Sequence, residues 1–343
     1  MIIFPEMNLL ILSCLLSSAM GMVSFAPSSL KTILGLQPLH ELFTVIEHPN
    51  ERGAMVLEAP VDQDGVKLYI AIDSDSYGHV DRPGNGGIRL LNYDNTEDAI
   101  DDAVRLAKGM TRKHDMFRTG FSGAKVVIKS DHKDLSVIQR KGLMEDAARA
   151  LQALEGGMYT GCDLNTGDTD MDYLVEATGE QFVLAGRNSR VDTNIATASS
   201  VIGSILGTVE AMNGSTDISE ITFTVQGCGK VGTTVAKELI RYGAKCVQTC
   251  DLFPECAKVP GCTPIKDWAS TTCDFLVPCA NSLVITEKVA ATFPDGIKYC
   301  VGATNSPFAN ANARAIFNER GVMHIPESIS SAGAILADSV EVR

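Results

Sequence analysis

The hydrophobic and polar positions of the first half predict a mixture of strands and helices. An apolar run over residues 66–73 indicates a strand, and a shorter run over 126–128 indicates another. Apolar residues at helical spacing predict amphipathic helices over 96–110 and 135–154. A long helix rich in small residues is expected over 192–212, where an Asn-Gly pair would end it.

The pattern changes from residue 221 onward. Short β-branched runs alternate there with helical stretches, and the runs read ITFTVQ, KCVQTC, DFLVP, KYCVG and VMHIP. This alternation is typical of a doubly wound parallel sheet. We therefore expect an α/β protein, with an N-terminal α/β domain over residues 38–187 and a doubly wound domain over residues 188–343.

The start of the chain differs from the rest. Residues 8–19 form an uncharged apolar run of the length found in signal peptides, although the usual basic residues before it are missing. The run is short for a membrane span. We expect residues 1–24 to be a targeting peptide, with a membrane anchor or a structural or wrongly assigned start as alternatives. Residues 22–27 resemble the cleavage motif of plastid preproteins in algae with secondary plastids, so we expect an organelle such as the plastid, with the secretory pathway as the alternative.

Composition and charge narrow the class of protein. The 343 residues are 45% hydrophobic and 21% charged, as in ordinary globular proteins with two domains. The net charge is -13, and no basic patch interrupts it, so we expect no nucleic-acid partner and no membrane partner for the mature form.

Cysteine usage indicates a reducing compartment. Nine of the ten cysteines lie beyond the leader, and none forms a CxxC pair. Cys250, Cys256 and Cys262 are evenly spaced, but no histidine or cysteine pair at zinc spacing accompanies them. We expect free thiols and no metal site.

A glycine-rich motif, Gly227-Cys228-Gly229-Lys230-Val231-Gly232, follows the strand expected over 221–226 and precedes a helix. This is the context that a dinucleotide-binding turn requires. The first glycine would allow the tight turn, the second would let the backbone approach a pyrophosphate, and the third would let the helix pack closely on the strand. The doubly wound domain is therefore expected to be a Rossmann-like dinucleotide-binding domain.

An acidic residue indicates which dinucleotide is bound. Asp251 follows the expected strand over 245–250, 19 residues after Gly232, where it would hold the ribose hydroxyls. Its carboxylate would repel a 2′-phosphate, so NAD is favoured over NADP. The alternative is a glycine-rich turn in some other α/β domain.

Two lysines in the first half point to chemistry on an amino acid. Lys113 and Lys125 lie 12 residues apart around a glycine-rich turn. A buried lysine can be driven toward neutrality and used for acid–base work, while a second, charged lysine can hold a carboxylate.

At these residues the chain resembles the glutamate, leucine, phenylalanine and valine dehydrogenase family, and above all its leucine and phenylalanine type. The motifs that carry the resemblance occur in the family's order over about residues 45–340: Gly86-Gly87-Ile88-Arg89, the KGMTRK segment Lys108–Lys113, Ser122-Gly123-Ala124-Lys125, Asp163-Leu164-Asn165-Thr166, Thr197, the fingerprint Gly227–Gly232, Cys279-Ala280, Asn305 and Ala332-Gly333.

The resemblance implies a role for each position. Lys113 would bind the substrate carboxylate beside Gly86, Gly87 and Met110. Lys125 would be the catalytic lysine of lowered pKa, and Asp163 would carry the amine proton, although Asp163 also suits a structural turn. The residues implied to bind the cofactor are Thr197, Gly227, Cys228, Gly229, Lys230, Val231, Gly232, Asp251, Cys279, Ala280 and Asn305.

Three departures from the family pattern bear on activity. Ser122 replaces a glycine, and a positive φ there would strain the segment that carries Lys125. Ser331 replaces an asparagine close to where the nicotinamide is expected. The sequence also stops at Arg343, where relatives continue.

The resemblance predicts oxidative deamination of an L-amino acid to its 2-oxo acid and ammonia with NAD, together with the reverse reaction, by a homo-oligomer. The alternative is an NAD-binding regulatory protein of this family that has lost turnover. In the family, the residue before the glycine pair and a residue after the Ala-Gly segment line the side-chain pocket. These positions are Asn85 and Asp338 here, which favours a polar, basic or indole side chain over leucine unless Asp338 lies on the surface.

Overall fold

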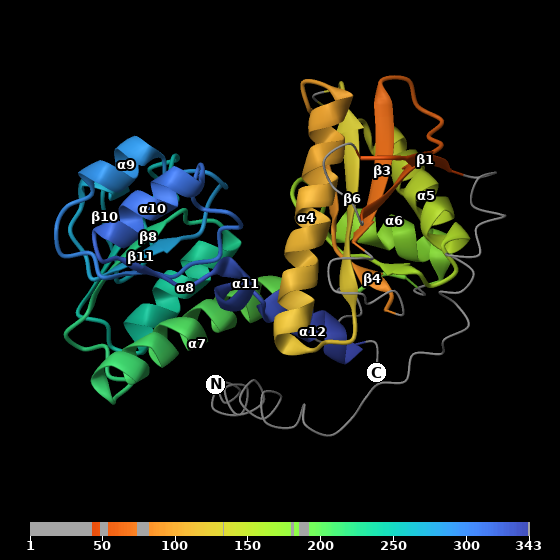
Figure 1. The fold of residues 1–343 in the computed structure, drawn as a ribbon. Coiled ribbons are helices and arrows are strands. Elements are labelled where there is room, and N and C mark those ends of the chain that lie inside the picture. Colours follow the sequence, from red (N-terminus) through yellow and green to blue (C-terminus); the bar gives the residue numbers. More distant parts are fainter. Residues whose placement is uncertain are drawn as a thin grey trace. The chain divides into compact units, whose positions relative to one another are not determined.

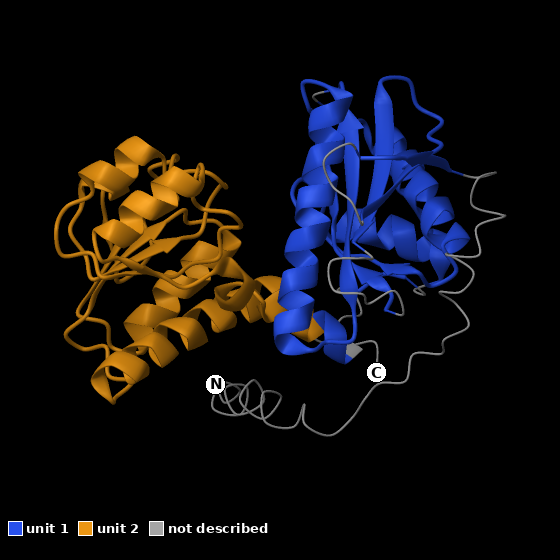
Figure 2. Cartoon of the chain, in the orientation of Figure 1, with its two compact units in different colours: residues 1–190, 338–343 blue, residues 191–337 orange. Residues whose placement is uncertain are grey.

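The computed structural model describes residues 43–48, 54–73, 82–132, 134–179, 182–184 and 192–341. The chain divides into two compact units, which Figure 2 colours separately: unit 1 comprises residues 1–190 and 338–343, and unit 2 comprises residues 191–337. The targeting peptide expected over residues 1–24 lies outside the described residues. Each unit is described by itself.

Unit 1 is built on a seven-stranded mixed sheet. Its strands lie in the order β1-β2-β3-β6-β4-β7, and β5 also pairs with β6. The strands are β1 (Thr44–Ile46), β2 (Ala54–Ala59), β3 (Val66–Asp73), β4 (Gly84–Asn85), β5 (Ile88–Leu91), β6 (Ser122–Ser130) and β7 (Met158–Tyr159). β6 runs antiparallel to β3 and parallel to both β4 and β5, so it is hydrogen-bonded along both edges.

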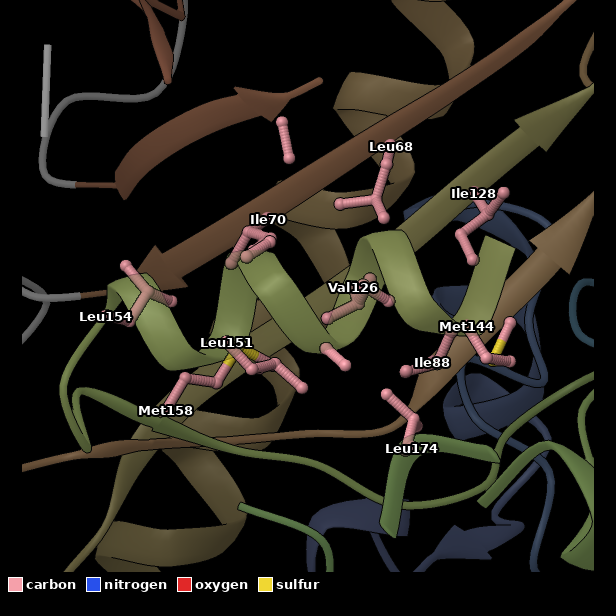
Figure 3. Packing of buried hydrophobic residues seen from close by; sticks show 14 of the residues in the cluster. Leu68, Ile70, Ile88, Val126, Ile128, Met144, Leu151, Leu154, Met158 and Leu174 are labelled. Carbon is pink, nitrogen blue, oxygen red and sulfur yellow. The ribbon is translucent and has the colours of Figure 1, made fainter. Parts of the chain in front are cut away.

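Helices cover both faces of this sheet (Figure 1). They are α4 (Thr96–Phe117), α5 (Val137–Ala153) and α6 (Asp168–Thr178). Successive side chains of a strand point to opposite faces. Tyr69 and Val127 therefore pack with α4, whereas Leu68, Ile70 and Val126 pack with α5 and α6. Figure 3 shows this second core, in which α5 lies across the strands.

Unit 2 contains a six-stranded sheet in which every strand is parallel to its neighbours. The strands are β8 (Thr222–Gln226), β9 (Cys246–Cys250), β10 (Thr263–Pro264), β11 (Phe275–Pro278), β12 (Tyr299–Cys300) and β13 (Met323–His324). Their spatial order is β10-β9-β8-β11-β12-β13. Numbered within the unit, this is the order 3-2-1-4-5-6 of a Rossmann fold, and its reversal point lies between β8 and β11. The expected doubly wound domain is confirmed.

Helices pack on both faces of this second sheet as well. They are α7 (Thr193–Asn213), α8 (Lys230–Arg241), α9 (Glu287–Thr292), α10 (Ala311–Glu319) and α11 (Glu327–Ser330), with a 3-10 turn, η1 (Trp268–Ser270). The last helix, α12 (Gly333–Glu341), begins in unit 2 and ends in unit 1. α7 is long and apolar enough to cross a membrane. Its residues Val201, Ile205 and Val209 are buried in the same core as Phe223 of β8, so it serves as a core helix.

Local signals explain where the long helices begin and end. Asp192 accepts hydrogen bonds from the first N–H groups of α7, and Gly214 ends that helix with a φ of 72°. Asn95 caps α4 in the same way. The expected helix over 192–212 is confirmed.

The nine cysteines beyond the leader are free thiols in the structure, and four of them are buried.

Two expected boundaries in unit 1 were wrong. The strand expected over 126–128 is longer and covers the whole of β6. Helices cover both faces of β6, so its sequence shows no alternation of apolar and polar residues from which its ends could be predicted. The helix expected over 96–110 continues to Phe117, because Thr111, Lys113 and His114 are buried on its inner side although all three are polar or charged. These corrections matter because both predicted site lysines lie in the extended parts.

Candidate active site

Lys125 lies in the middle of β6, not on a glycine-rich turn as the sequence indicated. Its side chain is 5% exposed. In β6, Val127 belongs to the core beneath α4, and Lys125 lies two residues away, so it shares that face. Arg89 of β5 is in register with Val127 and shares the face too. The acid–base candidate is thus held on a rigid strand.

The glycine pair before Arg89 brings three segments together. A Cβ atom at Gly86 would lie 1.7 Å from the carbonyl oxygen of Ala124, and one at Gly87 would lie 2.6 Å from that of Cys162 and 2.9 Å from the Cβ of Asp163. Real side chains cannot approach so closely. The pair therefore lets β6, with Lys125, and the segment with Asp163 come within contact of one another.

Lys125 and Asp163, predicted to act together, are in direct contact. The Nζ of Lys125 lies 2.8 Å from Oδ2 of Asp163. The Nε of Arg89 donates to the same oxygen at 2.8 Å. The hydroxyl of Thr166 donates to the carbonyl of Ile88 at 2.7 Å and accepts the N–H of Asp163 at 2.9 Å, which ties the segment to β5. In these contacts the Asp163 carboxylate pairs with two cations and accepts no backbone N–H of a turn. They therefore do not support the alternative that it only caps a turn.

The charges around this pair set its protonation state. Burial lowers the pKa of Lys125 below its ordinary value, and this outweighs the opposing attraction of Asp163, while Arg89 lowers the pKa further. Burial alone would raise the pKa of Asp163, but Lys125 and Arg89 outweigh it and hold that pKa well below its usual range. The site therefore favours an ionised Asp163 beside a lysine that loses its proton readily.

Helix α4 brings Met110 and Lys113 to the same face of the sheet. A Cβ atom at Gly123 would lie 1.9 Å from the carbonyl oxygen of Ala107, and the N–H of Gly123 donates to Oγ1 of Thr111 at 2.9 Å. The glycine thus allows close helix–strand packing. Lys113 is 8% exposed, and Met110 is half-buried three residues before it, on the same side of the helix.

His114 is a neutral structural residue beside this group. Its ring is fully buried, and Nδ1 lies 2.7 Å from the hydroxyl of Thr119. Burial, with the nearby cations Arg82 and Lys113, lowers the pKa of His114 to about 3.

Ser122 does not strain the segment that carries Lys125. It is the first residue of β6, and it is not among the described residues with a positive φ. Its hydroxyl donates to the carbonyl of Arg82 at 3.2 Å. The expected strain was wrong, because the position is extended strand, where serine is accommodated.

The glycine-rich motif of unit 2 lies at the reversal point of the sheet, between β8 and β11. Gly227 has a φ of 92°, and a Cβ there would lie 2.5 Å from the Cβ of Ala280. A Cβ at Gly232 would lie 1.9 Å from the carbonyl oxygen of Gly227. A Cβ at Gly229 would meet no described atom within 4 Å. The outer two glycines thus serve the turn and the helix packing, while the middle one faces open space.

The ends of three parallel strands meet around this turn. Asp251 follows β9 and accepts the N–H of Cys228 at 2.7 Å and that of Phe253 at 2.9 Å. Cys279 and Ala280 follow β11. α8 begins at Lys230 and Val231, and its N-cap Gly229 offers no side-chain hydrogen bond, so the first N–H groups of the helix remain available to an anion.

Further predicted cofactor residues lie on neighbouring segments of unit 2. Thr197 is on α7, and a Cβ at Gly333 would lie 1.8 Å from the carbonyl oxygen of Ala196, so the Ala-Gly segment packs directly on that helix. Asn305 is half-buried in the loop after β12. Ser331, the second departure, is buried and its hydroxyl donates to the carbonyl of Glu327 at 2.7 Å.

The roles of Arg89 and Asp102 were not predicted from the sequence. Arg89 was noted only as part of a motif, yet it contacts Asp163 directly and also donates to Asp102 of α4 at 3.0 Å. A charged residue two positions after a glycine pair, in an otherwise apolar strand, was the available signal. The partner Asp102 lies on a predicted helix, and only the packing of α4 over β3 and β6 shows that it faces Arg89.

The strand order and the glycine-rich turn of unit 2, together with the buried lysine–aspartate pair of unit 1, define a two-domain oxidoreductase with a dinucleotide-binding fold. The chain belongs to the glutamate/leucine/phenylalanine/valine dehydrogenase family. The model of the family's dimerisation domain matches residues 54–180, and that of its dehydrogenase domain matches residues 248–343.

Individual relatives agree with this assignment. A phenylalanine dehydrogenase of Lysinibacillus sphaericus is 30% identical over 287 residues, which cover 79% of this chain and 72% of that protein. A leucine dehydrogenase of Bacillus cereus is 30% identical over 288 residues, or 80% and 74%. The structure of an L-tryptophan dehydrogenase from Nostoc punctiforme matches with a TM-score of 0.63 at 24% identity, covering 80% and 78% of the two chains. That likeness shows the fold, and the two relatives show an oxidoreductase of the amino-acid dehydrogenase class.

Proposed function

We propose that this protein catalyses the oxidative deamination of an L-amino acid with NAD⁺ and water to the 2-oxo acid, ammonium, NADH and a proton, and also the reverse reaction. The observation that carries the proposal is the contact of 2.8 Å between buried Lys125 and Asp163. A lysine of lowered pKa beside an ionised carboxylate is the pair that acid–base work on an amine requires.

Substrate binding falls to the residues around this pair. Lys113, buried on α4, would hold the substrate carboxylate, because an ammonium group in a site of low polarity attracts a carboxylate strongly. Met110 lies on the same side of α4. Gly86 and Gly87, which let β6 and the Asp163 segment approach one another, would border the substrate beside Lys113. The α-carbon would then be placed next to Lys125.

Lys125 and Asp163 would divide the proton transfers. An oxygen of Asp163 takes the proton from the substrate ammonium, so that the amine can form an iminium when hydride leaves the α-carbon. Neutral Lys125 then takes a proton from water as the water adds to the iminium carbon, and later polarises the forming carbonyl. Asp163 then returns its proton to the nitrogen of the resulting carbinolamine, the C–N bond breaks, and the hydroxyl proton passes to the departing ammonia as the carbonyl forms.

The residues of unit 2 fit a dinucleotide. Gly229 faces open space at the start of α8, where the available N–H groups would hold the pyrophosphate, and Asp251 would hold the adenosine ribose. Thr197, Cys279, Ala280 and Asn305 would line the remainder of the cofactor site. When bound, NAD⁺ accepts the hydride. The Asp251 carboxylate favours NAD over NADP, because it would repel a 2′-phosphate.

Asn85 and Asp338, which the family resemblance places around the substrate side chain, support a polar or indole substrate over leucine. Asn85 is 1% exposed, and its side-chain carbonyl oxygen accepts no hydrogen bond from the described residues. A buried acceptor without a donor is costly, and a donor on the substrate would remove that cost. Asp338 is half-buried on α12, so it does not lie on a frayed surface. The organelle location expected from the leader stays a prediction.

The test is NADH formation by the purified chain at alkaline pH with leucine, valine, glutamate, lysine, phenylalanine and tryptophan, using NAD and NADP in parallel. Lys125→Ala should lower kcat by about 10²- to 10⁴-fold. Lys113→Ala should act mainly by raising KM. Lys129→Ala is the matched control, because Lys129 lies on the same strand but pairs with Asp131.

Two results would contradict the proposal. The first is the absence of turnover with every amino acid although NADH binds, which would favour the regulatory alternative. The second is near-full kcat in Lys125→Ala. A preference for leucine or valine would contradict only the proposal of a polar or indole substrate. The proposed reaction would stand.

A further inference from the structure

Arg89 is fixed on both of its sides. It lies on β5 with its side chain 12% exposed. Its Nε donates to Oδ2 of Asp163 at 2.8 Å, and its Nη1 donates to Oδ2 of Asp102 at 3.0 Å. The planar guanidinium therefore bridges two carboxylates, one from the reaction site and one from α4, which a lysine could not do in the same way.

Asp102 is itself fixed. Its Oδ2 also accepts the hydroxyl of Tyr93 at 2.7 Å, and its Oδ1 is paired with Arg105. The Asp102 side chain is 13% exposed. Arg89 is thus anchored by a carboxylate that two further side chains hold in place.

The two cations hold the same oxygen of Asp163. Both Lys125 and Arg89 contact Oδ2. Oδ1 accepts no hydrogen bond from the described residues and is not among their buried atoms without a partner, and the side chain is 24% exposed. Oδ1 is therefore the oxygen that a substrate amine can reach, and its direction is set by the bond to Oδ2.

We propose that Arg89, anchored by Asp102, is a positioning residue that holds Asp163 by Oδ2, presents Oδ1 to the substrate amine, and keeps Asp163 from acting as a simple counter-ion of Lys125. This inference rests on the proposed function, because it assigns roles within that reaction. The family resemblance gave Arg89 no role.

The balance of charges around Lys125 supports this role of Arg89. With Lys125 neutral, the two carboxylates Asp163 and Asp102 are balanced by Arg89 and Arg105. Protonation of Lys125 adds one uncompensated positive charge to a mostly buried cluster, which is unfavourable. The charged groups that face Lys125 shift its pKa in different directions. Asp163 and Asp102 raise this pKa, whereas Arg89 lowers it, in addition to the larger lowering caused by burial. Tyr93 is uncharged at neutral pH, because burial raises its pKa.

Two variants should therefore move the acid limb of the kcat/KM profile in opposite directions. Arg89→Met removes a cation, so the pKa of Lys125 rises and the limb moves to higher pH, by about one to three units. Asp102→Asn removes an anion but keeps an acceptor for Arg89, so the limb moves to lower pH. Arg89→Met should also lower kcat on the order of 10²-fold, because Oδ1 is no longer directed.

Further variants separate charge and geometry from folding. Arg89→Lys keeps the cation but loses the bridge, so it should keep a limb close to the wild-type position and lower kcat. Arg140→Met is the matched control: Arg140 makes a comparable two-nitrogen pair with buried Asp170, on α5 and α6, and its loss should lower the unfolding midpoint without moving the limb. NADH binding and thermal unfolding report whether each variant is folded.

The pKa of Lys125 can also be measured without turnover. The rate at which acetic anhydride labels Lys125, followed by mass spectrometry over a pH series, reports its titration directly. The same opposite shifts are expected in Arg89→Met and Asp102→Asn. If the wild type turns over while the two variants shift in one direction or not at all, the role of Arg89 is wrong and the proposed function stands. If the two variants show the opposite labelling shifts but the wild type does not turn over, the proposed function is wrong and the effect of Arg89 on Lys125 stands. Should Arg89→Met fail to fold, Arg89→Lys and Asp102→Asn decide by the same criteria.

Discussion

At the scale of the residue, the proposed chemistry depends on one buried lysine and the ions around it. Lys125 lies on β6, which is hydrogen-bonded along both edges. Burial lowers the pKa of Lys125 more than Asp163 raises it. Lys129 shares the face of β6 that Lys125 joins but lies near the end of the strand, where it pairs with Asp131. The two lysines therefore differ in their position along the strand and in the charged groups beside them, and not in the face that they join.

Asp251 carries the residue-scale prediction, because it combines a charge with two structural hydrogen bonds. Asp251→Asn keeps an acceptor for the N–H of Cys228 or Phe253 but removes the negative charge. The ratio of kcat/KM with NADP to that with NAD should rise on the order of tenfold, which corresponds to about 1.4 kcal/mol of lost repulsion. Steady-state rates with both cofactors measure it.

Asp251→Ala serves as the comparison for that prediction. It also leaves both N–H groups without their acceptor, so it should weaken binding of both cofactors in addition to changing the ratio. An unchanged ratio in Asp251→Asn, or a wild type that already prefers NADP, would show that the carboxylate does not select the cofactor.

At the scale of the element, glycines decide how closely strands, helices and turns approach one another. Gly123 admits α4 onto β6, and Gly232 admits α8 onto the turn after β8. Gly229 differs, because the space in front of it is open in the described structure. Three glycines of similar appearance in the sequence therefore serve packing in two cases and leave room for a ligand in the third.

The glycine motif allows these two uses to be separated by experiment. Gly229→Ala should leave the thermal unfolding midpoint of the protein without cofactor nearly unchanged and weaken NADH binding at least tenfold, or by about 1.4 kcal/mol, because the methyl group occupies the pyrophosphate's approach. Gly232→Ala should lower the unfolding midpoint, because its Cβ would lie 1.9 Å from a carbonyl oxygen.

NADH fluorescence titration and thermal unfolding measure the two effects on the same samples. Equal destabilisation by both substitutions, or wild-type NADH affinity in Gly229→Ala, would contradict the distinction between packing and ligand approach.

At the scale of the whole molecule, the proposed roles divide between two units. Unit 1 holds the residues proposed to act on an amine and a carboxylate, and unit 2 has the strand order and turn of a dinucleotide-binding domain. The family model that matches unit 1 is described as a dimerisation domain. In unit 1, β1 is at the edge of the sheet and exposes Val45, and such an edge is free to meet a second chain.

The whole-molecule prediction is a homo-oligomer. Light scattering after size-exclusion chromatography should give at least twice the mass of one chain, and the value should persist on dilution, because interfaces of obligate oligomers are large and apolar. Repeating the measurement at high salt tests whether the net charge of -13 contributes to the result. A single-chain mass at every concentration would show that the prediction is wrong.

The sequence alone determined the features that depend on neighbouring residues. The glycine spacing, the β-branched runs of unit 2, the capped helix α7 and the order of the motifs are all local patterns, and each led to the element or family that the structure and comparisons confirm. Lys125 and Asp163 were named together, but only as residues that a family resemblance placed at one site.

The tertiary structure decided what depends on which faces meet. β6 is covered on both sides, so its length and the burial of Lys125 were invisible in its pattern of apolar residues. Ser122 proved to be extended strand. Arg89 proved to bridge Asp163 and Asp102, because α4 packs over β3 and β6 on the face of the sheet that Arg89 shares. A buried ion acquires its properties from partners distant in sequence, and those partners become neighbours only when the chain is folded.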